Sequence, residues 1–191
     1  MCFGVIESYG EKMSDYQVGD FLMHESSGVC QVAEISEKAL QGKGSEKLYY
    51  SLDPVFQSGS QVITPVASKV RIRDVKSKEE MQNLLDKVLE LPVIREQNIR
   101  ALGDIFKEKM SEFDPVPLAT VVMTVYLREQ IRMAAGKKAM SSDEKVMATA
   151  GRKLFEEMAF ALGEDMDTVR TRFFKNLKTE KDLCIKTLEI Q

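Results

Sequence analysis

Two kinds of hydrophobic pattern divide the chain near residue 76. Over residues 16–75, short runs rich in β-branched and aromatic residues alternate with turn residues, which is typical of β-strands. From Ser77 onward, apolar residues recur at three- and four-residue spacing, which predicts amphipathic helices. The pattern therefore predicts an α+β protein, with a strand-rich first part followed by an all-helical second part.

Five short strands are expected in the first part, with Gly and Pro residues marking the turns between them. Five short strands within about sixty residues favour a small antiparallel barrel of the SH3 or Tudor kind. Residues 1–15 show no period and are expected to be an N-terminal extension. The expected strands are 20–25, 28–36, 46–52, 61–64 and 69–73, and residues 41–45 form a glycine-rich turn.

About five helices are expected in the second part. Ser77 and Glu80 form a capping box before the first helix, and the second helix spans about 95–112. Asp114 followed by Pro115 marks the start of the third helix, at 116–135, which is apolar nearly all round. A fourth helix is expected over 141–162, opened by a capping box of Ser141 and Glu144 and ended by Gly163. The last helix begins near Glu164 or Asp165 and runs into a C-terminal extension.

Composition and the absence of targeting signals indicate the class of protein and its cellular compartment. The chain has 191 residues, is 43% apolar and 30% charged, and has a net charge of −3, values typical of a globular protein. Its three cysteines are far apart, which argues against a disulfide framework or a cysteine-based zinc site. No signal peptide or membrane-spanning run is visible in it, so we expect a soluble cytoplasmic protein without a membrane partner.

The sequence contains few residues that are candidates for catalysis. His24 is the sole histidine and is expected to be structural, at the surface or half buried. Glu156 and Glu157 are adjacent on a helix and cannot act jointly, so we expect a solvated surface there. Cys30 is expected to be a buried small hydrophobe. We therefore expect no enzyme activity, metal, cofactor or small-molecule substrate. An enzyme of unknown type is an alternative that requires a convergent polar cluster.

Charge is distributed unevenly along the helical part. Residues 128–153 contain seven cations and three anions, a local charge of +4 in a chain that is acidic overall. Such cations can contact nucleic-acid phosphates, or they can simply solvate a helix surface, and charge alone leaves both interpretations open. The cations are Arg128, Arg132, Lys137, Lys138, Lys145, Arg152 and Lys153.

The order of several short motifs resembles one known family, the CarD/CdnL family of bacterial transcription regulators. In the first part, these motifs are Tyr16-Gln-Val-Gly-Asp20, His24 and Gly28-Val29. In the helical part, they are Leu127-Arg128, Ser141-x-x-Glu144-Lys145-x-Met147, Ala150, Leu154, Glu157 and Ala159. Family members have no catalytic activity, and the resemblance covers about residues 16–162.

The resemblance implies two binding surfaces. Residues 16–76 would be a Tudor-like domain that pairs an exposed sheet edge with a strand of the RNA polymerase β subunit. This contact maps to Val62, Ile63 and Thr64, with Lys38 on the preceding hairpin. Residues 77–191 would contact promoter DNA at the upstream edge of the melted region and favour the open complex.

For DNA, the resemblance places Lys145 at a position that touches the phosphate backbone, in the first turn of its helix. Many family members wedge a tryptophan into the minor groove, but this chain has no Trp, and Ile99 falls at the equivalent place. Further candidates for phosphate or groove contacts are Arg95, Arg100, Lys137, Lys138, Arg152 and Lys153. The absent Trp keeps an alternative open, a polymerase-binding adaptor with little direct DNA contact.

Overall fold

The computed structural model describes residues 15–40, 46–57, 59–67 and 69–179. The expectations for residues 1–14, for the turn at 41–45 and for the C-terminal extension from residue 180 lie outside this range. The chain divides into two compact units, residues 1–72 and 73–191. Each unit is described by itself.

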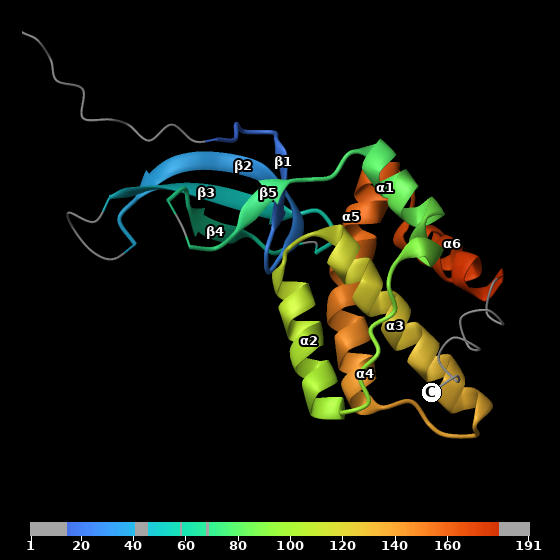
Figure 1. Ribbon diagram of the computed structural model, residues 1–191. Helices are drawn as coiled ribbons and strands as arrows, with labels where there is room; N and C mark the ends of the chain where they lie inside the picture. Colours follow the sequence, from blue (N-terminus) through green and yellow to red (C-terminus); the bar gives the residue numbers. More distant parts are fainter. Residues whose placement is uncertain (1–14, 41–45, 58, 68, 180–191) are drawn as a thin grey trace, which may run out of the picture. The chain divides into compact units, whose positions relative to one another are not determined.

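The first unit is built on a five-stranded sheet in the order β4-β3-β2-β1-β5 (Figure 1). The strands are β1 (Phe21–His24), β2 (Gly28–Lys38), β3 (Lys47–Pro54), β4 (Val62–Pro65) and β5 (Ile72–Asp74), the last of which ends in the second unit. The pairs β1–β2, β2–β3 and β3–β4 are antiparallel, and the long β2 carries a register shift between Val32 and Glu34. Since such a shift bends a strand, it suits a small barrel-like sheet, as the pattern predicted.

Period-two alternation produces the core of the first unit. Tyr50 and Leu52 on β3 share one buried cluster with Cys30 and Val32 on the neighbouring β2, and all four are at most 1% exposed. Tyr16 covers this core with its ring, whose centroid lies 6.1 Å from that of Tyr50 in an edge-on arrangement. Cys30 is therefore a buried hydrophobe, as expected.

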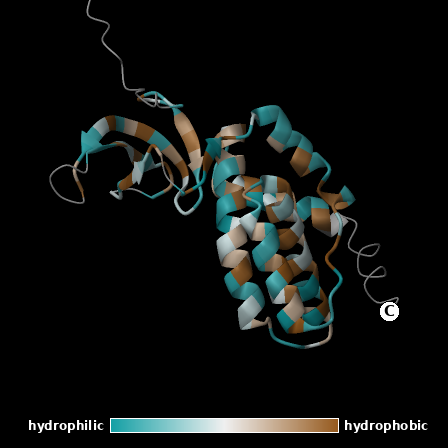
Figure 2. Cartoon of the chain, turned by 60° about the vertical axis from the view of Figure 1, so that its left-hand side comes forward, coloured by the Kyte–Doolittle hydropathy of each residue, from teal (hydrophilic) through white to brown (hydrophobic). Residues whose placement is uncertain are grey.

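The second unit is helical. Bands of hydrophobic and hydrophilic residues alternate along its helices, as amphipathic packing requires (Figure 2). None of the described helices is both long and apolar enough to cross a membrane. The helices are α1 (Lys78–Asp86), the 3₁₀ turn η1 (Val88–Glu90), α2 (Ile99–Ser111), α3 (Pro115–Ala134), α4 (Ser141–Val146), the π turn η2 (Met147–Gly151), α5 (Arg152–Leu162) and α6 (Met166–Thr179).

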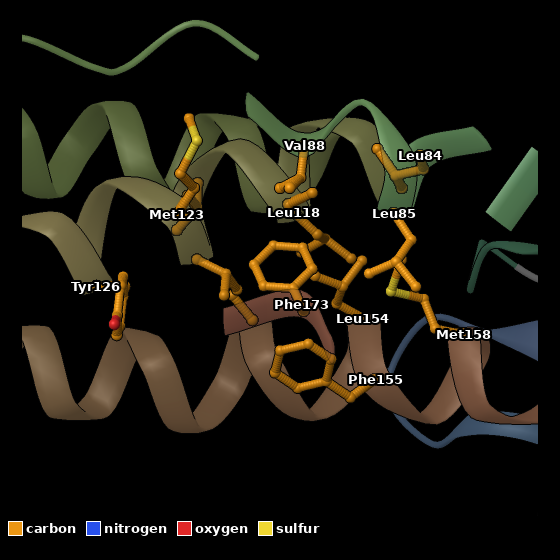
Figure 3. Close-up of a cluster of buried hydrophobic side chains, with 14 of the residues drawn as sticks. Leu84, Leu85, Val88, Leu118, Met123, Tyr126, Leu154, Phe155, Met158 and Phe173 are labelled. Atoms are coloured by element: carbon orange, nitrogen blue, oxygen red, sulfur yellow. The ribbon is translucent and has the colours of Figure 1, made fainter. Parts of the chain in front are cut away.

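The helical core forms around α3, where eleven residues are buried, including a continuous run from Leu118 to Leu127. Figure 3 shows α1, α3, α5 and α6 each contributing side chains to one cluster, with Phe173 of α6 near its centre. Phe155 and Phe173 meet edge to face with centroids 5.4 Å apart. The buried centre expected for the third helix is thus correct.

Local end signals set most helix boundaries. Ser77 and Glu80 form the expected capping box, and Asp114 caps α3 just before Pro115. Gly163 ends α5 in the left-handed conformation, with φ of 68°. The second helix begins at Ile99 rather than near residue 95, because the Asn98 side chain accepts hydrogen bonds from the first helical N–H groups.

The fourth helix is one continuous element formed by α4, η2 and α5, and its predicted capping box is wrong. The N-cap is Met140, which makes no side-chain cap hydrogen bond, and Ser141 is already the first helical residue. The buried Asp143 accepts from Arg128 at 3.2 Å, so this ion pair fixes the first turn where the capping box was expected. The five-residue π turn was not predicted.

Candidate functional site

The edge strand β4 is the first candidate surface. It pairs with β3 on one side only, so the backbone groups on its other side have no strand partner within the described sheet. The pairing register sets Ile63 opposite Ser51, and Val62 and Thr64 opposite Leu52 and Tyr50. Because Leu52 and Tyr50 belong to the core, Val62 and Thr64 point inward and Ile63 points outward.

Ile63 and Lys38 lie on the same outer face of the sheet. The ammonium of Lys38 donates to Ser51 Oγ at 2.8 Å, and Ser51 is the cross-strand partner of Ile63. Lys38 also lies 3.7 Å from a carboxylate oxygen of Glu34, whose side chain is 59% exposed. The structure therefore groups Lys38 and Ile63 around Ser51 on the outer face, and the role of Glu34 and Ser51 there was not foreseen.

Thr64 holds His24 on the inner side of the same strand. The Thr64 hydroxyl lies 3.1 Å from His24 Nε2, and the N–H of Ser27 donates to His24 Nδ1 at 3.2 Å. His24 is only 3% exposed, more buried than expected. Burial lowers its pKa below the ordinary value, and the charge of Glu25 partly offsets this. With both ring nitrogens engaged, His24 ties β1 to β4 as a structural residue.

The second candidate surface is one end of the helical unit. Figure 1 shows the start of α2, the start of α4 and the connection from α3 to α4 at this same end, and Figure 2 shows the same arrangement from another side. Ile99 is the first residue of α2 and is 57% exposed, and Arg95 and Arg100 beside it are exposed as well. An exposed isoleucine flanked by two arginines combines an apolar tip with cations suited to phosphates.

Three exposed lysines belong to the same end. Lys137 and Lys138 lie in the connection between α3 and α4, where Arg132 Nε donates to the Lys138 carbonyl at 2.9 Å. Lys145 is the fifth residue of its helix, past the first turn, which carries Asp143 and Glu144. The N–H groups of the helix start are therefore not beside Lys145, whose own ammonium is the group available to a phosphate.

Arg152 and Lys153 lie further along the helix and are only partly exposed. A guanidinium nitrogen of Arg152 lies 3.1 Å from a carboxylate oxygen of Glu156, one turn later. Glu156 is 3% exposed, and this burial raises its pKa, while Arg152 acts in the opposite direction. Arg152 thus already neutralises a buried carboxylate. The expectation that Glu156 lies on a solvated surface is wrong.

The same expectation is wrong for Glu157, which is fully buried. Arg73 donates to both its carboxylate oxygens, at 2.5 and 2.7 Å, and the Lys76 N–H donates to one of them at 3.1 Å. Arg73 Nε also donates to the carbonyl of Phe113 at 2.7 Å, and the guanidinium lies 4.9 Å from the Phe113 ring centroid. This cluster ties the first residues of the helical unit to α5 and to the connection before α3.

The groups on both surfaces are of kinds that bind other molecules. Within the described ranges, no three His, Cys, Asp or Glu side chains come together as a metal site would require. The candidate residues are exposed cations, an exposed isoleucine and an open strand edge. These are groups that bind extended backbone, phosphates and nucleobases.

A comparison with protein families identifies the first unit. Residues 16–76 match the family model of the CarD-like/TRCF RID domain, which confirms the family expected from the sequence. Domains of this family interact with RNA polymerase. The match ends before α1, so it does not extend to the helical candidate surface. No curated protein matches the chain.

Proposed function

Because residues 16–76 of this chain belong to the CarD-like/TRCF RID domain family, we propose that the protein is a transcription regulator acting at the RNA polymerase β subunit and at promoter DNA. RNA polymerase binding is the part of this function that the family itself supports. The β subunit as the target, the DNA contact and the modulation of open-complex stability are our extension of it. Such a protein would work in the bacterial cytoplasm.

The single observation that carries the polymerase contact is the open edge of β4 within the matched domain. An extended segment of the β subunit would add to the sheet as a further strand, with main-chain hydrogen bonds supplying affinity. Ile63 and Lys38 on the outer face would supply the side-chain contacts, while Val62 and Thr64 would contribute backbone groups only.

The test replaces Ile63 by Lys in the full chain and measures binding to purified RNA polymerase. Ile63 is 43% exposed, so the variant is expected to fold. Burying an apolar side chain at an interface stabilises it by about 1.5–3 kcal/mol, which predicts binding weakened by about 10- to 150-fold. Val55→Lys is the matched control, because Val55 is 41% exposed in the same unit but lies outside β4. Equal weakening by both variants would refute the β4 interface.

The proposed DNA contact combines Ile99 as an apolar wedge with phosphate contacts from Arg95, Arg100, Lys137, Lys138 and Lys145. The gathering of these positions at one end of the helical unit supports it. The test is the lifetime of a promoter open complex with the Lys145→Glu variant, which should shorten and should lose part of its salt dependence. Lys78→Glu is the control, since Lys78 is also exposed but lies on α1.

A second candidate function is a polymerase-binding adaptor with little DNA contact. The ion pair of Arg152 with Glu156 favours it, because that cation is already paired within the protein. Both candidates require polymerase binding, so the Ile63 variant does not separate them. An open-complex lifetime that is the same for Lys145→Glu and wild-type protein would favour the adaptor.

A further inference from the structure

A cavity of about 450 Å³ lies among α3, the continuous helix of α4, η2 and α5, and the start of α6. This volume falls in the range of small-molecule sites, roughly 300–1,000 Å³. None of Ile63, Ile99 or Lys145 lines it, so neither proposed binding surface accounts for it.

The apolar wall of this cavity depends on the π turn. Val125 of α3, Met147, Phe155 of α5 and Met166 of α6 line it together with Gly151. A Cβ added to Gly151 would lie 3.5 Å from Phe155 Cε2 and 3.6 Å from Met147 Sδ. The missing side chain therefore leaves room between two lining residues. π turns inside α-helices are rare and occur often at functional sites, and methionine walls adapt to varied ligand shapes.

The charged groups around the cavity are unevenly paired. Asp143 is held by Arg128, and Arg152 by Glu156, so these two lining residues are neutralised by partners that do not line the cavity. Three further carboxylates line it, and none has an ion-pair partner among the residues described: Glu129, Glu144 and Asp167. The remaining lining cation is Arg170, whose guanidinium carbon lies 5.9 Å from the Phe174 ring centroid. The lining therefore carries an excess of negative charge.

We infer that this cavity binds a small organic cation, a primary amine or guanidine carried on an apolar body. The body packs against Met147, Phe155 and Met166 and leaves water, and the cationic head lies among carboxylates that have no ion-pair partner in the described ranges. An anion would meet the excess negative charge, and a neutral analogue would gain no charge-assisted contact with the carboxylates.

The experiment titrates the full-length protein with hexylamine and with agmatine, and compares them with 1-hexanol and hexanoate. The methyl resonances of Met147 and Met166, assigned by substitution with Leu, report occupancy. Both cations should shift these two signals saturably in the millimolar range, and 1-hexanol should bind about tenfold more weakly, as loss of one charge-assisted contact implies. Hexanoate should not bind.

Three variants test the location. The double variant Glu129→Gln with Glu144→Gln should weaken amine binding about tenfold or more. Gly151→Ala should weaken it by occupying space, while thermal unfolding stays unchanged or rises, because the new Cβ makes only ordinary contacts and Ala favours the helix. Glu108→Gln, an exposed carboxylate on α2 outside the cavity, is the matched control.

Several results would overturn the assignment. Equal affinity for hexylamine and 1-hexanol would show that charge plays no role in binding. Unchanged binding by Gly151→Ala would show that the ligand does not bind in this cavity. Binding of an arginine-containing peptide without binding of either free cation would make the occupant a protein segment instead. The Ile63→Lys and Lys145→Glu variants should bind hexylamine normally, so failure of the proposed transcription function and failure of this site remain distinguishable.

Discussion

The ion pair between Arg73 and Glu157 should dominate the stability of the helical unit. Glu157 is fully buried, and two short hydrogen bonds from Arg73 and one from the Lys76 N–H satisfy its carboxylate. Arg73→Met would remove the guanidinium and leave a buried carboxylate with the Lys76 N–H alone. Removing one partner of a buried ion pair costs about 3–5 kcal/mol, because the remaining charge stays away from water.

Phe113 adds to this cost. It is a non-glycine residue in the left-handed region, with φ of 58°, and its carbonyl accepts the 2.7 Å hydrogen bond from Arg73 Nε. Such a backbone conformation persists only where neighbouring groups hold it. Losing the guanidinium removes both this hydrogen bond and the contact with the ring. We therefore expect a loss near the upper part of the 3–5 kcal/mol range, or about 10–20 °C in Tm.

Urea unfolding followed by far-ultraviolet circular dichroism measures this loss, since the chain has no Trp for fluorescence and its described helices are all in the second unit. Arg71→Met is the control, because the side chains of Arg71 and Glu25 are 45% and 38% exposed and such pairs contribute little. The double variant Arg73→Met with Glu157→Met should recover most of the loss, since no charge is then buried alone. The reasoning fails if Arg73→Met costs no more than Arg71→Met, or if the double variant is as unstable as the sum of the single ones.

Three further predictions concern single residues. Burial lowers the pKa of His24, so below about pH 6.5 the unfolded chain takes up a proton that the folded chain does not. The free energy of unfolding should therefore fall as the pH drops from about 7.5 to 5.5. Urea midpoints should show this fall in the wild type and much less of it in His24→Gln. Ile99→Ala should shorten the promoter open complex about fivefold by removing roughly 1 kcal/mol of apolar contact, whereas Ile99→Trp should lengthen it, as lifetime assays can determine. Ser77→Ala should cost about 1 kcal/mol by removing the N-cap of α1, measured by thermal unfolding.

The sequence predicted most of the fold because its signals are local. Strand alternation, proline and glycine punctuation and the capping residues act within a few positions, and these marked all five strands and the helix ends at Ser77, Asp114 and Gly163. The family motifs in residues 16–76 are equally local. Where an end signal depends on distant residues, the prediction failed.

The two capping-box motifs make this difference clear. Ser77 and Glu80 form the box, both are exposed, and the one ion-pair partner that the structure gives Glu80, Lys76, is four positions away. At Ser141 the same motif does not form, because Asp143 is buried and bonded to Arg128, fifteen positions earlier on α3. A contact between α3 and α4 thus fixes the start of α4, and no pattern of neighbouring residues in the sequence predicts this contact. The cavity beside this helix is invisible in the sequence for the same reason.

Glu156 and Glu157 show why the sum of formal charges along the sequence overestimates the positive charge exposed at the proposed DNA surface. The local rule that adjacent helix residues do not face each other holds, yet both are buried with different partners. The pair of Arg152 and Glu156 could be predicted from the sequence, because the two residues are one helical turn apart. The pair of Arg73 and Glu157 could not, because these residues are 84 positions apart. The local charge of +4 already counts Asp143 against Arg128, and it still overstates what the helix presents, because Arg152 neutralises the buried Glu156, which lies outside residues 128–153. Lys137, Lys138 and Lys145 are exposed and make no ion pair with the described residues, so any phosphate contact of this region rests mainly on these lysines rather than on the arginines.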